Sequence, residues 1–142
     1  MNEIDFQNVS AVCELFRSAC ETLRNGQYRR GSVVRLPAEG RVLVTGDLHD
    51  NPVHLKRIVE LARLDESPKH HVIFQEMIHG EHLINSMDFS HRMLIRIAAL
   101  VLKYPDQVHP LLANHELSQM TGKGVSKGAG NSVELFDDAL SY

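Results

Sequence analysis

The sequence has 142 residues, a length that fits one domain with a hydrophobic core of its own. Apolar residues make up 43% of the chain and charged residues 23%, which is typical of globular and not of disordered proteins. The formal net charge is -3, without a long basic run. The composition therefore argues against a nucleic-acid-binding protein and against attachment to an anionic membrane.

The first residues are acidic and polar, unlike a secretory signal peptide. The longest apolar run, 97–102, is too short to cross a bilayer. Cys13 and Cys20 stand on one predicted helix, ~10.5 Å apart along its axis, which is too far for a disulfide. We expect two reduced cysteines on a buried helix face, and a cytoplasmic protein.

The first part of the chain reads as a helix followed by strands. Apolar residues at helical spacing predict an amphipathic helix over 6–23, so that residues 1–30 form an N-terminal helical segment. Two strands, 32–36 and 41–45, follow, and the Pro-Ala-Glu-Gly between them predicts a hairpin-like turn. A helix then runs over 52–64, since proline is tolerated in its first turn.

The rest alternates between strands and helices. Residues 71–75 and 108–113 predict strands, with a helix over 90–104 between them that a proline stops. A glycine-rich stretch and a last helix over 133–140 follow. Strand–helix alternation favours an α/β fold with a parallel-sheet core and right-handed crossovers, which we assign to one domain over 31–142.

Polar side chains follow three successive strands of this predicted sheet. Asp47 and His49 follow the first strand, Glu76 the second, and Asn114-His115-Glu116 the third. Parallel strands lie ~4.8 Å apart, and their carboxyl ends form the binding edge of such sheets. Each motif alone is typical of a polar turn. Together, carboxylate, amide and imidazole groups suit divalent ions, so we predict a shared metal site.

Two stretches resemble a known family. The sequences GDLHDN (46–51) and LLANHEL (111–117) resemble the first and third signature blocks of the calcineurin-like metallophosphoesterases, which are related to serine/threonine phosphatases. The segment VIFQEMIHG (72–80) lies where the family has its middle block. The resemblance implies the N-terminal half of a four-layer αββα sandwich. Because the chain ends soon after the third block, we expect the C-terminal part of that domain to be missing.

The resemblance also implies roles at the site. Asp47 and His49 would bind a first metal ion, Asn114 a second, and Glu76 would bridge the two. His115 would be the catalytic residue, as an acid or a phosphate-binding cation beside the leaving group. The two ions would be Mn, Fe, Zn or Mg. Glu116, His79 and His82 would contact substrate or support the ligands.

The sequence departs from the family pattern at several positions. Gln75 and Ala113 replace glycines, His79 stands where an aspartate orients the catalytic histidine, and Gly80 stands where an arginine binds phosphate. In addition, the family takes further histidine ligands from its C-terminal half. No histidine follows His115 in this sequence.

These features predict a metal-dependent phosphatase that acts on a phosphorylated protein or small molecule, with no nucleic-acid or membrane partner. The alternative is a degenerate or truncated member that binds a metal or a partner without turnover. Since half of the implied sandwich is absent, one sheet face should expose apolar surface, and the chain should self-associate.

Other histidines have more than one interpretation. His79, Glu81, His82 and Asp88 fit a solvated loop with a helix cap, or His79 or His82 lines a phosphate pocket. Glu76-x-x-His79 also matches an element of helical di-iron proteins, but a second copy is not visible. The remaining histidines are expected to be structural or exposed: His54, His70, His71, His91 and His109.

Overall fold

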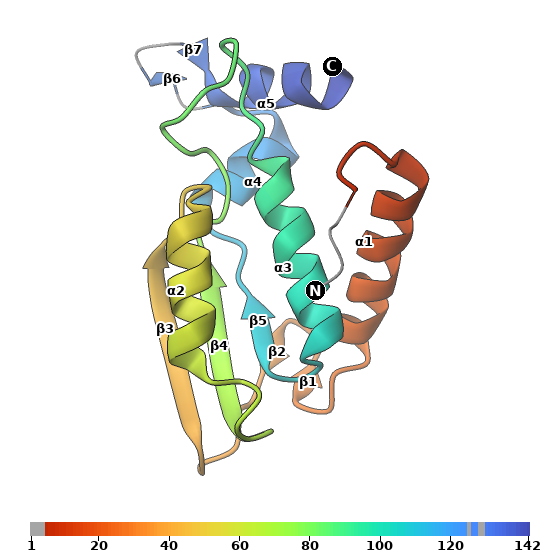
Figure 1. Cartoon of the computed structure of the whole chain (residues 1–142), viewed down its shortest axis with the longest axis vertical. Helices are drawn as coiled ribbons and strands as arrows, with labels where there is room; N and C mark the ends of the chain where they lie inside the picture. Colours follow the sequence, from red (N-terminus) through yellow and green to blue (C-terminus); the bar gives the residue numbers. More distant parts are fainter. Residues whose placement is uncertain (1–4, 125, 128–129) are drawn as a thin grey trace.

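The computed structural model describes residues 5–124, 126–127 and 130–142. Figure 1 shows how the helices and strands are arranged, coloured from the N-terminus to the C-terminus. In chain order they are α1 (Val9–Arg24), β1 (Arg29–Arg30), β2 (Val33–Val34), β3 (Arg41–Asp47), α2 (Pro52–Ala62), β4 (His70–Gln75), α3 (His91–Lys103), β5 (Val108–Pro110), α4 (Asn114–Thr121), β6 (Ser126–Lys127), β7 (Gly130–Asn131) and α5 (Ser132–Ser141).

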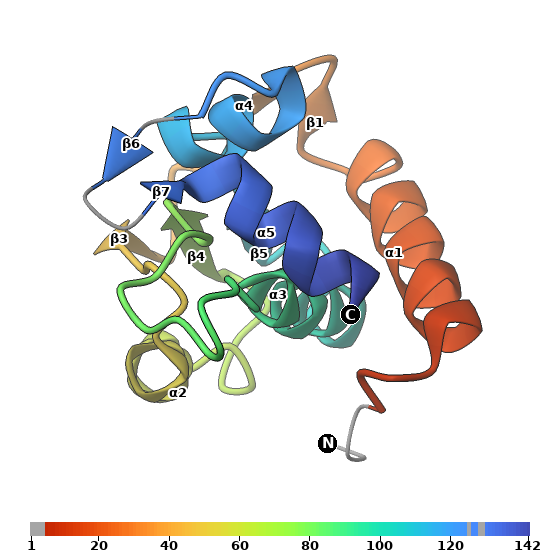
Figure 2. The ribbon, with the colours of Figure 1, turned by 90° about the horizontal axis from the view of Figure 1, so that it is seen from above.

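The central feature is a three-stranded parallel sheet in the order β3-β4-β5. Helix α2 connects β3 to β4 and helix α3 connects β4 to β5, and both helices lie on the same side of the sheet (Figure 2). Both crossovers are right-handed, and each one adds the next strand on the same side of the strand before it, which gives the order β3-β4-β5. The predicted α/β class with a parallel sheet and flanking helices is therefore confirmed.

The core lies between the sheet and these helices. Val72 and Phe74 of β4 are fully buried, and Met93, Ile97 and Val101 of α3 pack in the same cluster. The spacing of four residues along α3 keeps these three side chains on one helix face. Helix α1 packs on α3 and extends the core away from the sheet (Figure 1).

The opposite face of the sheet is open along β3. The side chains of Val42 and Val44 are 49% and 63% exposed, and they lie on the face that α2 and α3 do not cover because alternate strand residues point to opposite faces. The expected exposed apolar surface is therefore present. Self-association through it stays a prediction.

The strand expected over 32–36 has a different partner from the one predicted. It pairs with β1 and not with β3, because the chain turns at Gly31, whose φ is +63°. Gly40 is not part of a hairpin: a Cβ there would lie 2.2 Å from the Lys69 carbonyl oxygen. Close approach to Lys69, together with a φ of +111°, explains that glycine.

Two further expectations need correction. The third strand ends at Pro110, and Asn114 already begins helix α4. Cys13 and Cys20 are free as expected but are exposed. Helix α1 contacts the core through Phe16, Ala19 and its neighbours, so the cysteines lie beside the narrow buried stripe and not on it.

Within the described part of the chain, no helix is both long and apolar enough to cross a membrane. The glycine-rich stretch before the last helix falls partly outside the described residues.

Candidate metal centre

The chain segments that follow β3 and β4 are joined by backbone hydrogen bonds. The amide groups of Leu48 and His49 both donate to the Glu76 carbonyl, at 3.0 and 2.7 Å, and the amide of Asp50 donates to the Met77 carbonyl at 2.9 Å. These bonds continue the pairing of the two strands past their ends. They place His49 directly beside Glu76.

Three side chains from separate segments meet at this edge. His49, Glu76 and His115 each offer one ligand atom, and these atoms all lie within 4.8 Å of one another. His115 Nε2 is 3.4 Å from Glu76 Oε2, and the rings of His49 and His115 are 5.1 Å apart between centroids. Glu76 and His115 are buried. Since metal–nitrogen and metal–oxygen bonds of ~2.1 Å put neighbouring ligands about 3 Å apart, a divalent ion fits with small side-chain movements.

The surroundings of His49 favour the form that binds a metal. Its Nδ1 lies 3.3 Å from the carbonyl oxygen of Ile78. A carbonyl oxygen only accepts, so this contact requires the proton on Nδ1 and leaves the lone pair on Nε2. Histidine ligands in metal sites are commonly held by such a backbone carbonyl.

Asp47 and Asn114 lie at the exposed rim. Asp47 Oδ2 is 3.8 Å from His49 Nε2, and the Asp47 side chain is 55% exposed. Its other oxygen accepts a hydrogen bond from Gln75 Nε2 at 3.2 Å. Asn114, the first residue of α4, is exposed. Asp47 is thus close enough to share an ion with His49, and the metal role of Asn114 stays a prediction.

Glu116 is buried and joins α4 to the segment after β4. Its Oε1 accepts from the amides of Met77 and Ile78, at 2.7 and 3.3 Å, and its Oε2 accepts from the amide of Ala113 at 3.1 Å. Its two oxygens therefore hold the start of the helix against the other strand end. A substrate contact does not fit this position; Glu116 instead fixes the place of His115.

His79 and Asp88 form a buried pair, which the expected solvated loop did not anticipate. His79 Nδ1 lies 2.7 Å from Asp88 Oδ2, and both side chains are almost fully buried. Ser90 completes the group: its amide donates to Asp88 Oδ1 at 2.9 Å, and its hydroxyl accepts from the His79 amide at 3.0 Å. His82 is exposed, as a solvated loop residue is. No spacing rule in the sequence connects His79 to Asp88.

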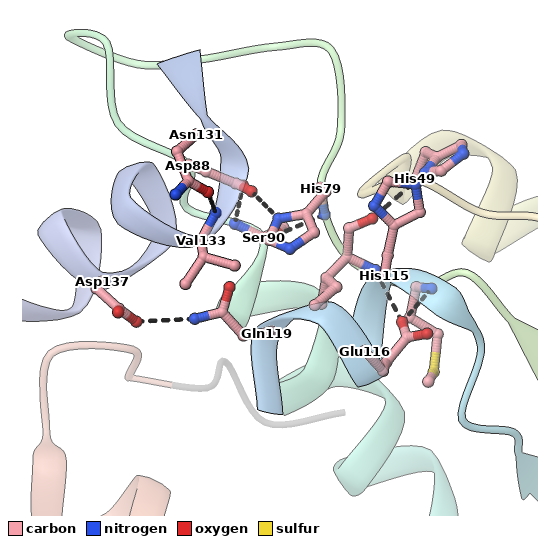
Figure 3. A network of polar contacts seen from close by, with 12 residues as sticks. His49, His79, Asp88, Ser90, His115, Glu116, Gln119, Asn131, Val133 and Asp137 are labelled. Carbon is pink, nitrogen blue, oxygen red and sulfur yellow. Dashed lines mark hydrogen bonds and ion pairs between the residues drawn. The ribbon is translucent and has the colours of Figure 1, made fainter. Parts of the chain in front are cut away.

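The electrostatics of this pair are settled by its hydrogen bonds. Burial acts to raise the pKa of Asp88, but the hydrogen bonds from His79 and Ser90 outweigh it and hold the pKa below its usual range. Asp88 is therefore a carboxylate, which accepts from the Nδ1–H of His79. Figure 3 shows this group on one side of His115 and His49 on the other.

The backbone at the site is strained. His49, Asp50, Glu76 and His79 all have positive φ, at 43°, 49°, 47° and 60°, a region that residues other than glycine rarely adopt. Such strain concentrates at functional sites. Gly80 shows how tight the packing is, because a Cβ there would lie 2.8 Å from the His49 carbonyl oxygen. An arginine at this position does not fit.

Comparison of the sequence with models of known protein families gives no match. A search of curated proteins likewise finds no relative of this chain. The interpretation of the site consequently depends on its geometry.

Proposed function

We propose that this protein binds divalent metal at His49, Glu76 and His115 and hydrolyses phosphoesters there, as a divergent relative of the calcineurin-like metallophosphoesterases. The observation that carries the proposal is the convergence of these three ligand atoms within 4.8 Å. They come from two strand ends and from the start of α4. A parallel sheet with one open face is also compatible with half of a two-sheet sandwich.

The donor set fits the ion. One carboxylate and two imidazoles suit Mn²⁺, Fe²⁺ or Zn²⁺, and Asp47 at the rim adds an oxygen ligand next to His49. Glu76 is the one carboxylate among the three converging residues, and its two oxygens can bridge two ions. When bound, the metal lowers the pKa of a coordinated water and stabilises charge on the phosphate. The exposed rim at Asp47 is where a phosphorylated substrate reaches the site.

A second candidate function is metal binding without turnover. Among the residues that the structure describes, the group of His49, Glu76 and His115 is the one set of three or more acidic, histidine or cysteine side chains with this spacing. A dinuclear centre needs more ligands than this set provides. A site with these three ligands alone would hold one ion and bind it without turnover.

Two measurements on the same preparations test both functions. Calorimetric titration with Mn²⁺ and Zn²⁺ should show binding to the wild-type chain and its loss in Glu76→Gln. Glu81→Gln, which changes an exposed carboxylate in the same region, is the matched control. Hydrolysis of p-nitrophenyl phosphate is measured with and without each ion.

The outcomes separate the candidates. Binding with metal-dependent hydrolysis, both lost in Glu76→Gln, supports the phosphoesterase. Binding with no hydrolysis favours the non-catalytic protein. A wild-type chain that binds neither ion contradicts both functions.

A further inference from the structure

The outer edge of β3 offers backbone hydrogen-bonding groups that the described part of the chain does not use. β3 is an end strand of the three-stranded sheet, and β4 is its neighbour there. The Arg41 amide donates to the Lys69 carbonyl, on the β4 side, at 3.0 Å. Backbone groups of successive strand residues point to opposite sides in the plane of the sheet, so the N–H and C=O groups of Val42 and Val44 point away from β4. Such an edge is a template for a further strand.

A groove of about 340 Å³ runs along the same edge, between β3 and α2. Figure 1 shows β3 at the edge of the sheet with α2 beside it. Apolar side chains line the groove, from Leu43 of β3 and from Ile58 and Leu61 of α2. Leu61 is 46% exposed although it is apolar. The groove therefore fits an apolar side chain.

The groove leads to the candidate metal centre. Asp47 lines the groove, and its Oδ2 lies 3.8 Å from His49 Nε2. Apart from its chain neighbours, a Cβ at Gly46 would meet no described atom within 4 Å, so open space continues along the strand up to Asp47. The pairing of β3 with β4 is irregular between Val44 and Asp47, and such bulges are common next to active sites. The edge and the candidate centre thus form one continuous surface.

These features together favour a polypeptide as the occupant. A small phosphoester can enter the groove, but it has no row of donors and acceptors to match an edge strand, whereas an extended peptide has one. Alternate side chains of an extended peptide point the same way. One apolar side chain can therefore enter the groove while a phosphorylated one reaches Asp47.

We infer that the substrate is a phosphorylated protein segment that adds to β3 as a further strand. Its apolar residue stands two or four positions from the phosphorylated residue, because side chains on one face alternate and Leu43 lies about 13 Å along the strand from Asp47. This inference rests on the proposed function and names the substrate class of the same site.

The first measurement follows the edge in the wild-type chain. The probe is a synthetic peptide of about nine residues, long enough to form a strand. It has leucine at alternate positions on both sides of a phosphonate analogue of phosphoserine, which cannot be hydrolysed. On titration into the Zn²⁺-loaded chain, the amides of Val42 and Val44 should shift in NMR spectra and exchange their protons about tenfold more slowly or less, because they donate to the added strand. The amides of Arg41 and Leu43, which face β4, are the internal reference.

Two pairs of variants locate the contacts, with peptide affinity measured by fluorescence anisotropy. Val44→Pro removes the outward N–H at an edge position where proline is tolerated, and Val44→Thr keeps this N–H as the matched control. Leu61→Ser makes the groove wall polar. Val53→Ser is its control, because Val53 is an exposed apolar residue of α2 outside the groove. Val44→Pro and Leu61→Ser should each weaken binding about tenfold, and the controls less than about twofold.

The results distinguish this inference from the proposed function. If the wild-type chain binds no Zn²⁺ by calorimetry, both are wrong. If Zn²⁺ binds but the Val42 and Val44 amides neither shift nor slow, or Val44→Pro binds the peptide as tightly as Val44→Thr, the substrate does not add to β3 while the metal site remains. Protection of these amides that rises with protein concentration and needs no peptide would mean that a second copy occupies the edge. Equal affinity for a peptide without the phosphonate would make the edge a partner site and not a substrate site.

Discussion

Both ends of the three-stranded sheet contain buried histidines, but the groups around them differ. At the amino end, His71 of β4 and His109 of β5 are in contact: His71 Nδ1 lies 3.2 Å from His109 Nε2 and 3.1 Å from the Asp106 carbonyl oxygen. The Asp106 carboxylate instead accepts from the Gln27 amide at 2.9 Å. The imidazoles at this end thus contact each other and a neutral carbonyl.

At the carboxyl end each histidine pair includes an acid. Glu76 lies beside His115 and Asp88 beside His79, at 3.4 and 2.7 Å. At the amino end burial lowers the pKa of His71, and burial together with the neighbouring His71 lowers that of His109 to about 4. The comparison teaches that burial alone makes a neutral structural histidine. The cation site that we propose at the carboxyl end depends on the carboxylate beside each histidine.

The largest expected effect comes from removing the acid that the carboxyl end depends on. A ligand at about 1,000 times its dissociation constant stabilises the folded chain by about 4 kcal/mol. Zn²⁺ should therefore raise the melting temperature of the wild-type chain, and Glu76→Gln should abolish the rise. Thermal unfolding with and without Zn²⁺ measures this. An equal rise in Glu76→Gln would show that Glu76 does not give the carboxyl end of the sheet a metal affinity that the amino end lacks.

The second effect concerns acid at the amino end. The unfolded chain takes up a proton at His109 near pH 6.5, whereas the folded chain does so only near pH 4. Stability is therefore full above pH 6.5 and falls as the pH drops from 6.5 to 4, by up to about 3 kcal/mol. Urea unfolding across this range should show the loss, and His109→Gln should reduce it. His54→Gln, at an exposed position, should keep the wild-type slope; if His109→Gln keeps it too, His109 is not its source.

A third, smaller effect is expected at Glu116, which holds the carboxyl end together. In Glu116→Gln an amide nitrogen would face backbone N–H donors, and the buried unpaired groups should cost about 1–3 kcal/mol. Urea unfolding without metal measures this cost, with the exposed Glu60→Gln as control. A change within 0.5 kcal/mol would mean that the three amide contacts do not position α4.

The smallest effect is expected at Asn114. It is exposed at the start of α4, so Asn114→Ala should change stability by less than about 0.5 kcal/mol. The metal affinity of the Asn114→Ala variant is the informative quantity, because the family resemblance makes Asn114 a ligand. Unchanged Zn²⁺ affinity by calorimetry would confine the site to the residues that the structure brings together. A clear loss would show that Asn114 turns inward when the metal binds.

The sequence predicted the order of the main elements well because their signals are local. Helical spacing defined α1, α2 and α3, and the alternation with β3 and β4 predicted the parallel sheet. The predicted hairpin partner of β2 was wrong, because the sequence does not show at which of two glycines the chain turns. Gly31 turns the chain, while Gly40 packs on Lys69, and only tertiary contact distinguishes them.

The site was predictable in part for the same reason. His49, Glu76 and His115 follow from the rule that strand ends converge, and the structure brings them together. The buried pair of His79 and Asp88 and the role of Glu116 depend on how a long loop folds back on the sheet. No periodicity encodes such a path, so these contacts had to come from three-dimensional structure.

The positive φ angles at His49, Glu76 and His79 have a consequence for evolution and engineering. At each of these positions glycine would relieve the backbone, so a selection for thermal stability alone would favour replacing these side chains, two of which are ligands of the proposed metal centre. A library of this chain, sorted separately for stability and for Zn²⁺ binding, should enrich opposite residues at these positions. The enrichment of glycine in the pool sorted for stability would then measure how much stability the chain loses by keeping these side chains.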